Sequence, residues 1–532
     1  MSDALLEKRP SSFREKLAQL MFVRIGSNLP PVRTVEEDLQ RIEDLLKKCP
    51  LGGLVLFNGR RDETAKSLSR LQSQSRYPLL IGADIERGIG QQLIGHTMFP
   101  HAMAFDALGA EAEIAVEQFA KLTAVAAISN GIHIVFAPVA DVNVDPQNPI
   151  IATRAFGIEP ERVARLVKAF VKGCQAEGLL ATAKHFPGHG NTHEDSHSSL
   201  PNVDSTRGEL EACELVPFRA AIDADVALIM TAHVQYPQLD NRGTPATLSF
   251  PILTELLRNH LGFQGATISD SLLMEGFKRE SANEGELAVE ALNAGVDILL
   301  DVGDPLATLD TMNVALAKGL LSEKRVDEAF ARLWRLKESA FTDLGQLTAH
   351  APTDNGQKAE LDDRLATNLA LDCAKRAIRI VSNNDSILPL DKNKSLLTVL
   401  LKPFEASLDS PEQPLAEALR ERFPQQKYFE LEPHCEQAIL DKISNQATQA
   451  DQLLVAMIVK PAAWHQFGLE EKHAKLLHRL LKHHCCVLAS LGTLEALKPF
   501  DNAACAQLCT YSDVPVSQLA LAEKLVARSS QG

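Results

Sequence analysis

The stretch Leu179–Leu200, LLATAKHFPGHGNTHEDSHSSL, joins a short apolar run to a polar loop that contains glycine and proline. The apolar run has the length of a buried strand, so Lys184 and His185 are expected where that strand reaches its carboxyl end. The loop that follows is rich in histidine, a residue of which the whole chain has 16. Because α/β folds place reactive groups at this end of their strands, the stretch predicts an α/β fold with a chemically active loop.

Apolar runs of strand length recur on both sides of this stretch, with helical stretches between them. The runs are too continuously apolar for a sheet with one face in water, which favours a parallel sheet covered on both faces. Eight β-then-α units close most simply into a (β/α)8 TIM-type barrel. The predicted strands are Gln19–Ile25, Gly53–Phe57, Leu79–Ile85, His133–Val142, Leu180–His185, Ala227–Val234, Gly265–Asp270 and Val296–Leu300.

A second domain is predicted after the barrel, because strands alternate with helices again beyond a polar segment. We expect the barrel over residues 1–342, a linker over 343–356 and a smaller open α/β sandwich domain over 357–532. The strands expected in the second domain are Leu396–Leu401, Leu453–Val459 and Cys486–Leu491, and the helices are Pro414–Arg422, Glu470–Lys482 and Val516–Arg528.

Charge and composition narrow the range of partners. The 532 residues include 54 basic and 69 acidic side chains, which give a formal charge of −15. This charge repels a phosphate backbone, so nucleic acid is not expected as a partner. The chain starts with charged residues, and no apolar run approaches the ~18 residues of a membrane span. The nine cysteines include no C-x-x-C pair, which is typical of free thiols in a reducing compartment, so we expect a soluble cytoplasmic protein. We also expect a monomer or homodimer that binds a small ligand.

The segment His193–His197 reads H-E-D-S-H and satisfies the zinc-protease pattern H-E-x-x-H. That pattern requires both histidines on one face of a helix, and Pro187 and Gly190 before it disfavour a helix, so we expect no metal. Asp195 and His197 are better placed for proton transfer, because a carboxylate two residues away can fix the tautomer of an imidazole and raise its basicity. A solvated loop without function is the alternative interpretation.

Other predicted strand ends carry polar side chains that a barrel brings to the same rim. Asp270 ends the seventh predicted strand, although an aspartate there could instead cap the helix that follows. Asp84 comes after Leu80-Ile81-Gly82-Ala83 near the end of the third strand, and His233 comes after Ile229-Met230-Thr231-Ala232 near the end of the sixth. Together with Lys184 and His185, these residues are too many to be explained as helix caps, so they predict one site.

The motifs resemble the β-N-acetylglucosaminidases of glycoside hydrolase family 3. The resemblance lies in K-H-F-P-G-H-G and D-S-H, in I-S-D-S-L-L-M, in N-P-I-I-A-T-R-A-F-G and in the D-x-E-x-G at Asp84, and it runs through residues 15–340. It implies that Asp270 is the nucleophile and that His197, backed by Asp195, is the acid/base. It also implies that the sugar is bound by Asp84, Arg154, Lys184 and His185. We add His233 to these substrate-binding residues.

The implied reaction is retaining exo-cleavage of terminal β-linked N-acetylglucosamine through a glycosyl-Asp270 ester, without metal or organic cofactor. Muropeptides and chito-oligosaccharides are the substrates that the resemblance implies. Three alternatives stay open: a phosphorylase, in which phosphate replaces water, a family 3 β-glucosidase, and a catalytically silent sugar-binding protein. Two positions depart from the family, since Ser271 follows Asp270 and Ile89 stands where an arginine is often found.

Overall fold

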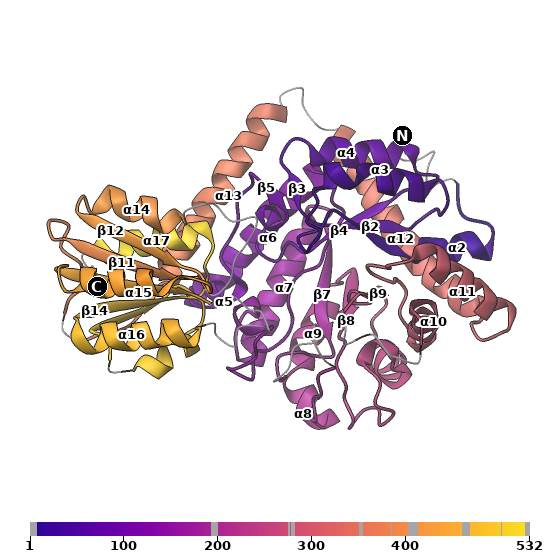
Figure 1. Cartoon of the computed structure of the whole chain (residues 1–532). Coiled ribbons are helices and arrows are strands. Elements are labelled where there is room, and N and C mark those ends of the chain that lie inside the picture. Colours follow the sequence, from indigo (N-terminus) through magenta and orange to yellow (C-terminus); the bar gives the residue numbers. More distant parts are fainter. Residues whose placement is uncertain are drawn as a thin grey trace. The chain divides into compact units, whose positions relative to one another are not determined.

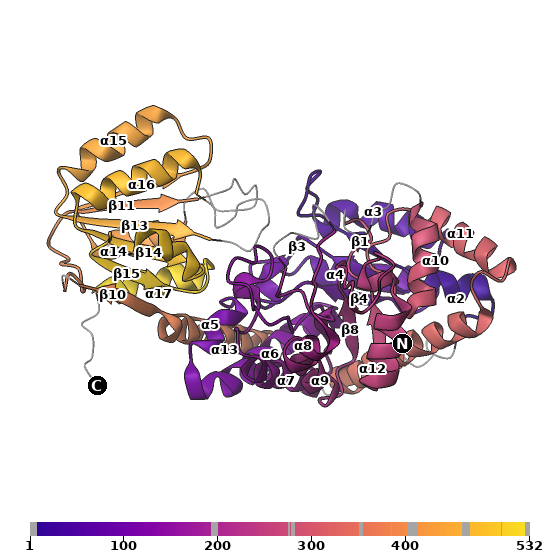
Figure 2. The same ribbon diagram turned by 90° about the horizontal axis from the view of Figure 1, so that it is seen from below.

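The chain forms two compact units (Figures 1 and 2). The computed structural model describes residues 8–192, 200–274, 277, 282–349, 355–384, 386–402, 413–459, 469–501 and 503–526. The first unit consists of Met1–Thr97, Glu113–Asp145 and Ala155–Ala366, and the second of Met98–Ala112, Pro146–Arg154 and Thr367–Gly532.

The first unit contains a parallel seven-stranded sheet in the order β1-β2-β4-β6-β7-β8-β9. Nearly all residues of these strands are buried, as expected for strands covered on both faces. Each of the first seven predicted strands overlaps one of them, and only β7 extends beyond its predicted range, by one residue. They are β1 (Phe22–Ile25), β2 (Gly53–Leu56), β4 (Leu80–Ala83), β6 (Ile134–Val135), β7 (Leu180–Phe186), β8 (Leu228–Thr231) and β9 (Ala266–Ile268).

The eighth predicted strand, Val296–Leu300, closes the sheet into a ring. It pairs through isolated parallel bridges, from Ile298 to Ile268 on one side and from Leu299 to Met21 on the other. The Phe22 amide donates to the Leu299 carbonyl over 2.9 Å, so backbone hydrogen bonds continue across this closure. The predicted TIM-type barrel is therefore confirmed.

Helices surround the strands, and local sequence explains where several begin (Figure 1). The helix α3 (Val35–Leu46) starts with reciprocal hydrogen bonds between Thr34 and Glu37, a capping box. The helix α7 (Pro160–Ala176) has its proline in the first turn, where no amide hydrogen is needed. The others are α2 (Phe13–Gln19), α4 (Thr64–Gln74), α6 (Ala112–Ser129), α8 (Arg207–Ala212), α9 (Leu215–Ile222), η5 (Pro251–His260), α10 (Glu284–Ala294), α11 (Pro305–Ala317) and α12 (Glu323–Ala349). The helix α13 (Asn355–Ala377) contains residues of both units.

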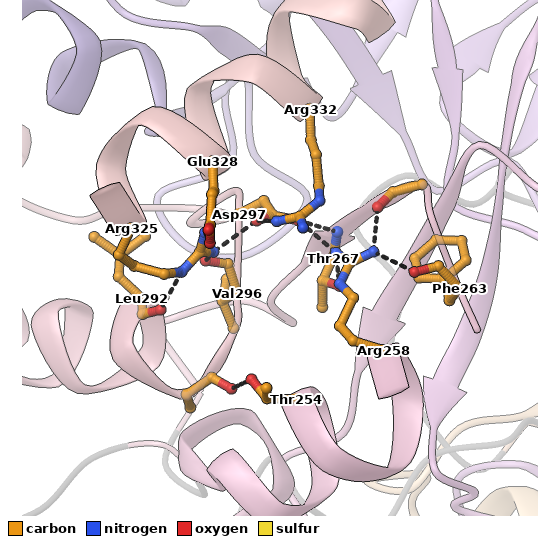
Figure 3. A network of polar contacts seen from close by, with 12 residues as sticks. Thr254, Arg258, Phe263, Thr267, Leu292, Val296, Asp297, Arg325, Glu328 and Arg332 are labelled. Carbon is orange, nitrogen blue, oxygen red and sulfur yellow. Dashed lines mark hydrogen bonds and ion pairs between the residues drawn. The ribbon is translucent and has the colours of Figure 1, made fainter. Parts of the chain in front are cut away.

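A buried carboxylate lies at one end of the closing segment (Figure 3). The side chain of Asp297 is fully buried and accepts from three guanidinium groups. Nitrogen–oxygen distances are 2.6 Å to Arg258, 2.6 Å to Arg325 and 3.0 Å to Arg332. The amide of Thr267 in β9 donates to the same carboxylate over 2.9 Å. One side chain thus ties the closing segment to β9, to η5 and to α12.

The second unit contains a six-stranded sheet in the order β10-β15-β14-β13-β11-β12, in which β10 is antiparallel and the others are parallel. Helices α15 and α16 cover one face, and α14 and α17 cover the other (Figures 1 and 2). The strands are β10 (Arg379–Asn383), β11 (Leu396–Leu401), β12 (Gln426–Leu431), β13 (Gln452–Ile458), β14 (Cys486–Leu491) and β15 (Ala506–Cys509), and the helices are α14 (Pro414–Arg422), α15 (Gln437–Ala447), α16 (Glu471–His483) and α17 (Pro515–Val526).

The limits of the predicted domains differ from the compact units. Residues 343–349 of the predicted linker belong to α12, and residues 355–356 belong to α13. Residues 343–349 include one glycine, Gly345, and can stay helical, because glycine inside a helix costs only about 1 kcal/mol. The second unit also takes in residues 98–112 and 146–154. The two-domain order is as predicted, whereas the boundaries at 342 and 357 stay predictions.

Candidate active site

Lys184 forms a charged cluster with two carboxylates at the carboxyl ends of β4 and β7. Its Nζ lies 2.7 Å from Asp84 Oδ1 and 2.7 Å from Glu86 Oε1. The lysine side chain is only 3% exposed, and these two carboxylates compensate its charge. The Asp84 side chain is 31% exposed, which lets it bind a hydroxyl group of a ligand. Sequence reasoning did not assign a role to Glu86, although the D-x-E spacing at Asp84 was a usable signal.

His185 is held by Asp141, a fully buried residue that follows β6 in sequence. The carboxylate lies 2.7 Å from His185 Nδ1 and also accepts from the backbone amides of His185 and His189. Because a carboxylate accepts, Nδ1 carries the hydrogen, and Nε2 faces away from this partner. Sequence analysis missed Asp141, but a charged residue inside the apolar run 133–142 was the signal that could have found it.

The first part of the histidine-rich loop is tightly packed. The hydroxyl group of Tyr236 donates to the Gly188 carbonyl, and His189 Nδ1 lies 2.9 Å from Thr192 Oγ1. A Cβ atom on Gly190 would lie 1.6 Å from the Val142 carbonyl oxygen, so only glycine fits there. These contacts determine where the chain leaves toward residues 193–199. The predicted dyad Asp195 and His197 lies outside the described residues, and its role stays a prediction.

Burial controls the ionisation of groups behind this loop. Tyr236 is fully buried, and burial, reinforced by the negative charge of Asp141, raises its pKa well above the usual range. Tyr236 therefore stays a neutral hydrogen-bond donor. Burial also raises the pKa of the neighbouring Glu214 carboxyl, and the charge of Asp141 acts in the same direction. A raised pKa favours the neutral form of the Glu214 carboxyl.

Asp270 follows β9, and its neighbour Ser271 fixes its orientation. The Ser271 amide donates to Asp270 Oδ1 over 2.7 Å, and the Ser271 carbonyl accepts from His233 Nε2 over 3.1 Å. His233 is fully buried, and its Nδ1 lies 2.7 Å from Thr247 Oγ1. Both ring nitrogens of His233 thus contact protein atoms. The structure brings His233 next to the end of β9, where it binds the Ser271 carbonyl, and its expected contact with substrate stays a prediction.

Arg154 lies in the short helix η3 (Ala152–Arg154), within a segment of the second compact unit. Its Nη1 donates to the Ile150 carbonyl over 3.2 Å. The buried side chain of Asn148 accepts from the amides of Ile150 and Ile151, which fixes the turn that carries the arginine. The expected contact of Arg154 with the sugar stays a prediction.

The described residues contain no group of three or more histidine, cysteine, aspartate or glutamate side chains that could hold a metal ion. The string H-E-D-S-H lies outside these residues. Across the described ranges, no helix is long and apolar enough to cross a membrane.

The barrel and its rim define an α/β protein with acidic, basic and imidazole groups at the carboxyl ends of parallel strands. This is the usual arrangement of barrel enzymes. Residues 12–336 match the family described as Glycosyl hydrolase family 3 N terminal domain, which is more than half of the chain. The chain belongs to glycosyl hydrolase family 3, as its motifs predict.

Relatives and solved structures extend this match. Beta-hexosaminidase A of Pseudoalteromonas piscicida is 34% identical over 394 residues, which make up 68% of this chain and 64% of that protein. A beta-hexosaminidase of Tolumonas auensis is 35% identical over 315 residues, 57% of this chain and 92% of that protein. The structure of a glycoside hydrolase family 3 β-N-acetylglucosaminidase from Paenibacillus sp. has 28% identity and a TM-score of 0.84, and each chain is covered to 97%. The chain thus spans slightly less than two thirds of the first relative.

Proposed function

We propose that the protein is a retaining exo-β-N-acetylglucosaminidase in which Asp270 is the nucleophile. The observation that carries this proposal is the position of Asp270 after β9, on the same rim as the Lys184 cluster and the His185–Asp141 pair. Membership of glycosyl hydrolase family 3 and similarity to proteins named beta-hexosaminidase support it.

The reaction has two displacements at the anomeric carbon. The bond from the Ser271 amide restricts rotation of the Asp270 carboxylate, which favours one orientation for attack. His197, held by Asp195, gives its proton to the leaving oxygen as the Asp270 ester forms. Neutral His197 then takes a proton from water, which releases N-acetylglucosamine with retained configuration.

The remaining site residues bind the sugar. Asp84 accepts from hydroxyl groups, while the buried Lys184 orients Asp84 and carries positive charge close to the ligand. His185, whose Nδ1 is held by Asp141, presents Nε2 to the ligand, and Arg154 makes a charge-assisted contact. The natural substrates that we propose are muropeptides or chito-oligosaccharides.

We also propose a cytoplasmic location and a monomer or homodimer. All nine cysteines are free thiols, which is typical of a reducing compartment. Burial raises the pKa of the thiols of Cys373 to about 12 and Cys49 to about 11, so these side chains are inert at neutral pH.

Aryl glycosides provide the direct test. The purified protein should release the aryl group from a β-N-acetylglucosaminide much faster than from the matching β-glucoside, with free N-acetylglucosamine as the product. Saturating inorganic phosphate should change the rate less than about twofold. Asp270→Asn, which preserves the shape of the side chain, should retain less than about 1% of the activity and the same unfolding temperature.

Three results contradict specific parts of the proposal. Faster cleavage of the β-glucoside would show that the protein is a β-glucosidase and not a β-N-acetylglucosaminidase. Accumulation of the sugar 1-phosphate with added phosphate would make the protein a phosphorylase. A folded Asp270→Asn variant with more than a few per cent of wild-type activity would remove Asp270 from the role of nucleophile.

A further inference from the structure

A second carboxylate, Asp301, lies at the other end of the segment that closes the barrel. Its side chain is only 2% exposed and forms a two-point ion pair with Arg24 of β1. Arg24 Nε lies 3.1 Å from Asp301 Oδ1, and Arg24 Nη2 lies 2.5 Å from Asp301 Oδ2. Two parallel hydrogen bonds of this kind fix the plane of a carboxylate and are among the strongest in proteins.

Asp301 uses this fixed orientation to hold Ser271. The Ser271 hydroxyl donates to Asp301 Oδ2 over 2.7 Å. A neutral donor that binds a charged acceptor makes a stronger hydrogen bond than two neutral groups, so the hydroxyl is firmly held. Ser271 is the residue directly after Asp270, and thus the contact with Asp301 lies one residue from the proposed nucleophile.

Three atoms of Ser271 are held at the same time. The hydroxyl binds Asp301, the carbonyl accepts from His233, and the amide donates to the Asp270 carboxylate. The hydroxyl and the carbonyl of Ser271 are held on either side of its Cα atom, which limits rotation of the residue about φ and ψ and so restricts the direction of its amide N–H. The Ser271 amide therefore transmits the position of Asp301 to Asp270.

Arg24 is itself anchored independently of Asp301. Its guanidinium carbon lies 4.7 Å from the centroid of the Phe57 ring, and its backbone carbonyl accepts from Arg41 Nη2 over 2.6 Å. The Arg24 side chain is 22% exposed. Arg24 of β1 thus anchors Asp301, and Asp301 binds Ser271 at the end of β9.

The backbone of Asp301 also departs from ordinary strand geometry. Its φ angle is +61°, a left-handed conformation that costs a residue with a side chain roughly 1–2 kcal/mol. The contacts of the Asp301 carboxylate with Arg24 and Ser271 are available to offset this cost. Unfavourable backbone conformations of this kind gather at functional sites, where surrounding contacts maintain them.

We propose that Arg24 and Asp301 are a positioning pair that acts through Ser271 to hold the Asp270 carboxylate in the orientation for attack. The inference rests on the proposed role of Asp270. Neither Arg24 nor Asp301 needs to touch the sugar. Because a nucleophile displaced by about 1 Å can lose roughly 100-fold in rate, loss of this support should lower kcat far more than it changes KM.

The test compares kcat, KM and the unfolding temperature for variants of Ser271 and Asp301. Ser271→Ala removes the hydroxyl and should lower kcat about tenfold with less than a twofold change in KM. Ser271→Thr keeps the hydroxyl and should restore kcat to within about threefold of the wild type. Asp301→Asn should lower kcat at least as much as Ser271→Ala, because the amide also weakens the bond to Arg24.

Asp240 offers a chemically matched control. It is 6% exposed, forms a two-point ion pair with Arg242 and accepts from the Ser249 hydroxyl over 2.6 Å. Asp240→Asn therefore removes the same kind of cluster, and it should lower the unfolding temperature while kcat per folded molecule stays unchanged. This comparison separates a positioning role from a contribution to stability alone.

Two outcomes overturn the inference. In the first, Ser271→Ala and Asp301→Asn lower the unfolding temperature but retain kcat within twofold. In the second, Ser271→Thr is as impaired as Ser271→Ala. If Asp301→Asn does not fold, the comparison of Ser271→Ala with Ser271→Thr tests the inference by itself. The measurement uses whichever aryl glycoside the wild type cleaves, so a wrong substrate class contradicts the proposed function without deciding this inference, and a wild type that cleaves none overturns both.

Discussion

Replacing Asp297 by asparagine should destabilise the barrel strongly. The substitution keeps the volume of the side chain but removes the negative charge that faces Arg258, Arg325 and Arg332. Three guanidinium groups then face an amide whose NH2 group must point at one of its former donors. Burial already lowers the pKa of Arg258 to about 10, which shows how poorly the site solvates a positive charge.

The size of the effect follows from the exposure of the three arginines. Breaking a buried ion pair by removing one partner costs about 3–5 kcal/mol. Arg258 and Arg325 are only 11% and 13% exposed, whereas Arg332 is 22% exposed and can gain some hydration. Both buried arginines also donate to backbone carbonyls, and these bonds survive the substitution. We therefore expect a loss of about 4 kcal/mol, a large part of the 5–15 kcal/mol that is typical of a domain.

Equilibrium unfolding in urea measures this loss. The chain has two tryptophans, and a Trp464→Phe background leaves the buried Trp334 of α12 as the fluorescent reporter of the barrel. Asp310→Asn is the control, because Asp310 is 68% exposed and pairs with the exposed Arg14, so its loss should cost less than about 0.5 kcal/mol. A loss below about 1 kcal/mol for Asp297→Asn would show that the arginines do not depend on this carboxylate.

Three further predictions concern pH, a loop glycine and the lysine cluster. Burial, with a smaller contribution from a nearby lysine charge, lowers the pKa of His133 to about 4. Neutral His133 therefore contributes its whole share of the free energy of unfolding above pH ~6.5, and this contribution falls by about 3 kcal/mol toward pH 4, because over this range the unfolded chain binds a proton that the folded chain does not. Urea unfolding at pH 7 and pH 5 should show this slope, and His133→Asn should reduce it. Gly190→Ala forces the loop away from the Val142 carbonyl and should lower kcat at least tenfold, whereas Gly208→Ala, where a Cβ meets nothing within 4 Å, should not. Lys184→Met leaves two carboxylates without their cation and should lower kcat/KM about 100-fold; a loss below about fivefold would contradict its role.

Continuous apolar runs explain why the barrel could be predicted from the sequence. In a sheet covered on both faces each strand is apolar throughout, so the strands can be recognised in the sequence. Their number, eight, predicts a closed barrel. The strand β12 was missed because it is an edge strand with half-exposed residues and mixed polarity, QKYFEL. The strand β15 has only four residues and lacks a strong local signal. Composition did not reveal that residues 343–349 continue α12, because composition does not distinguish a helix end from a loop.

The candidate site was predictable where a reactive residue follows an apolar run. Asp84, Lys184 and Asp270 were selected in this way; the structure pairs Lys184 with Asp84, and the roles of all three stay predictions. Asp141 and Asp301 were not assigned, because their importance comes from contacts with residues more than 40 and 270 positions away, which a single sequence does not reveal. His233 lies two residues beyond the end of β8, and only the structure shows that both of its ring nitrogens contact protein atoms.

The closing segment of the barrel pairs with its neighbours through isolated bridges, while a buried carboxylate at each end is bound by arginines. Only a short stretch of backbone hydrogen bonds therefore joins the ring at this point, and the ion pairs of the two carboxylates add to it. Amide hydrogens such as those of Phe22 and Leu299 should exchange with solvent through local opening before the rest of the sheet. Since Asp270 borders this seam, catalytic competence should disappear while most of the secondary structure is still intact.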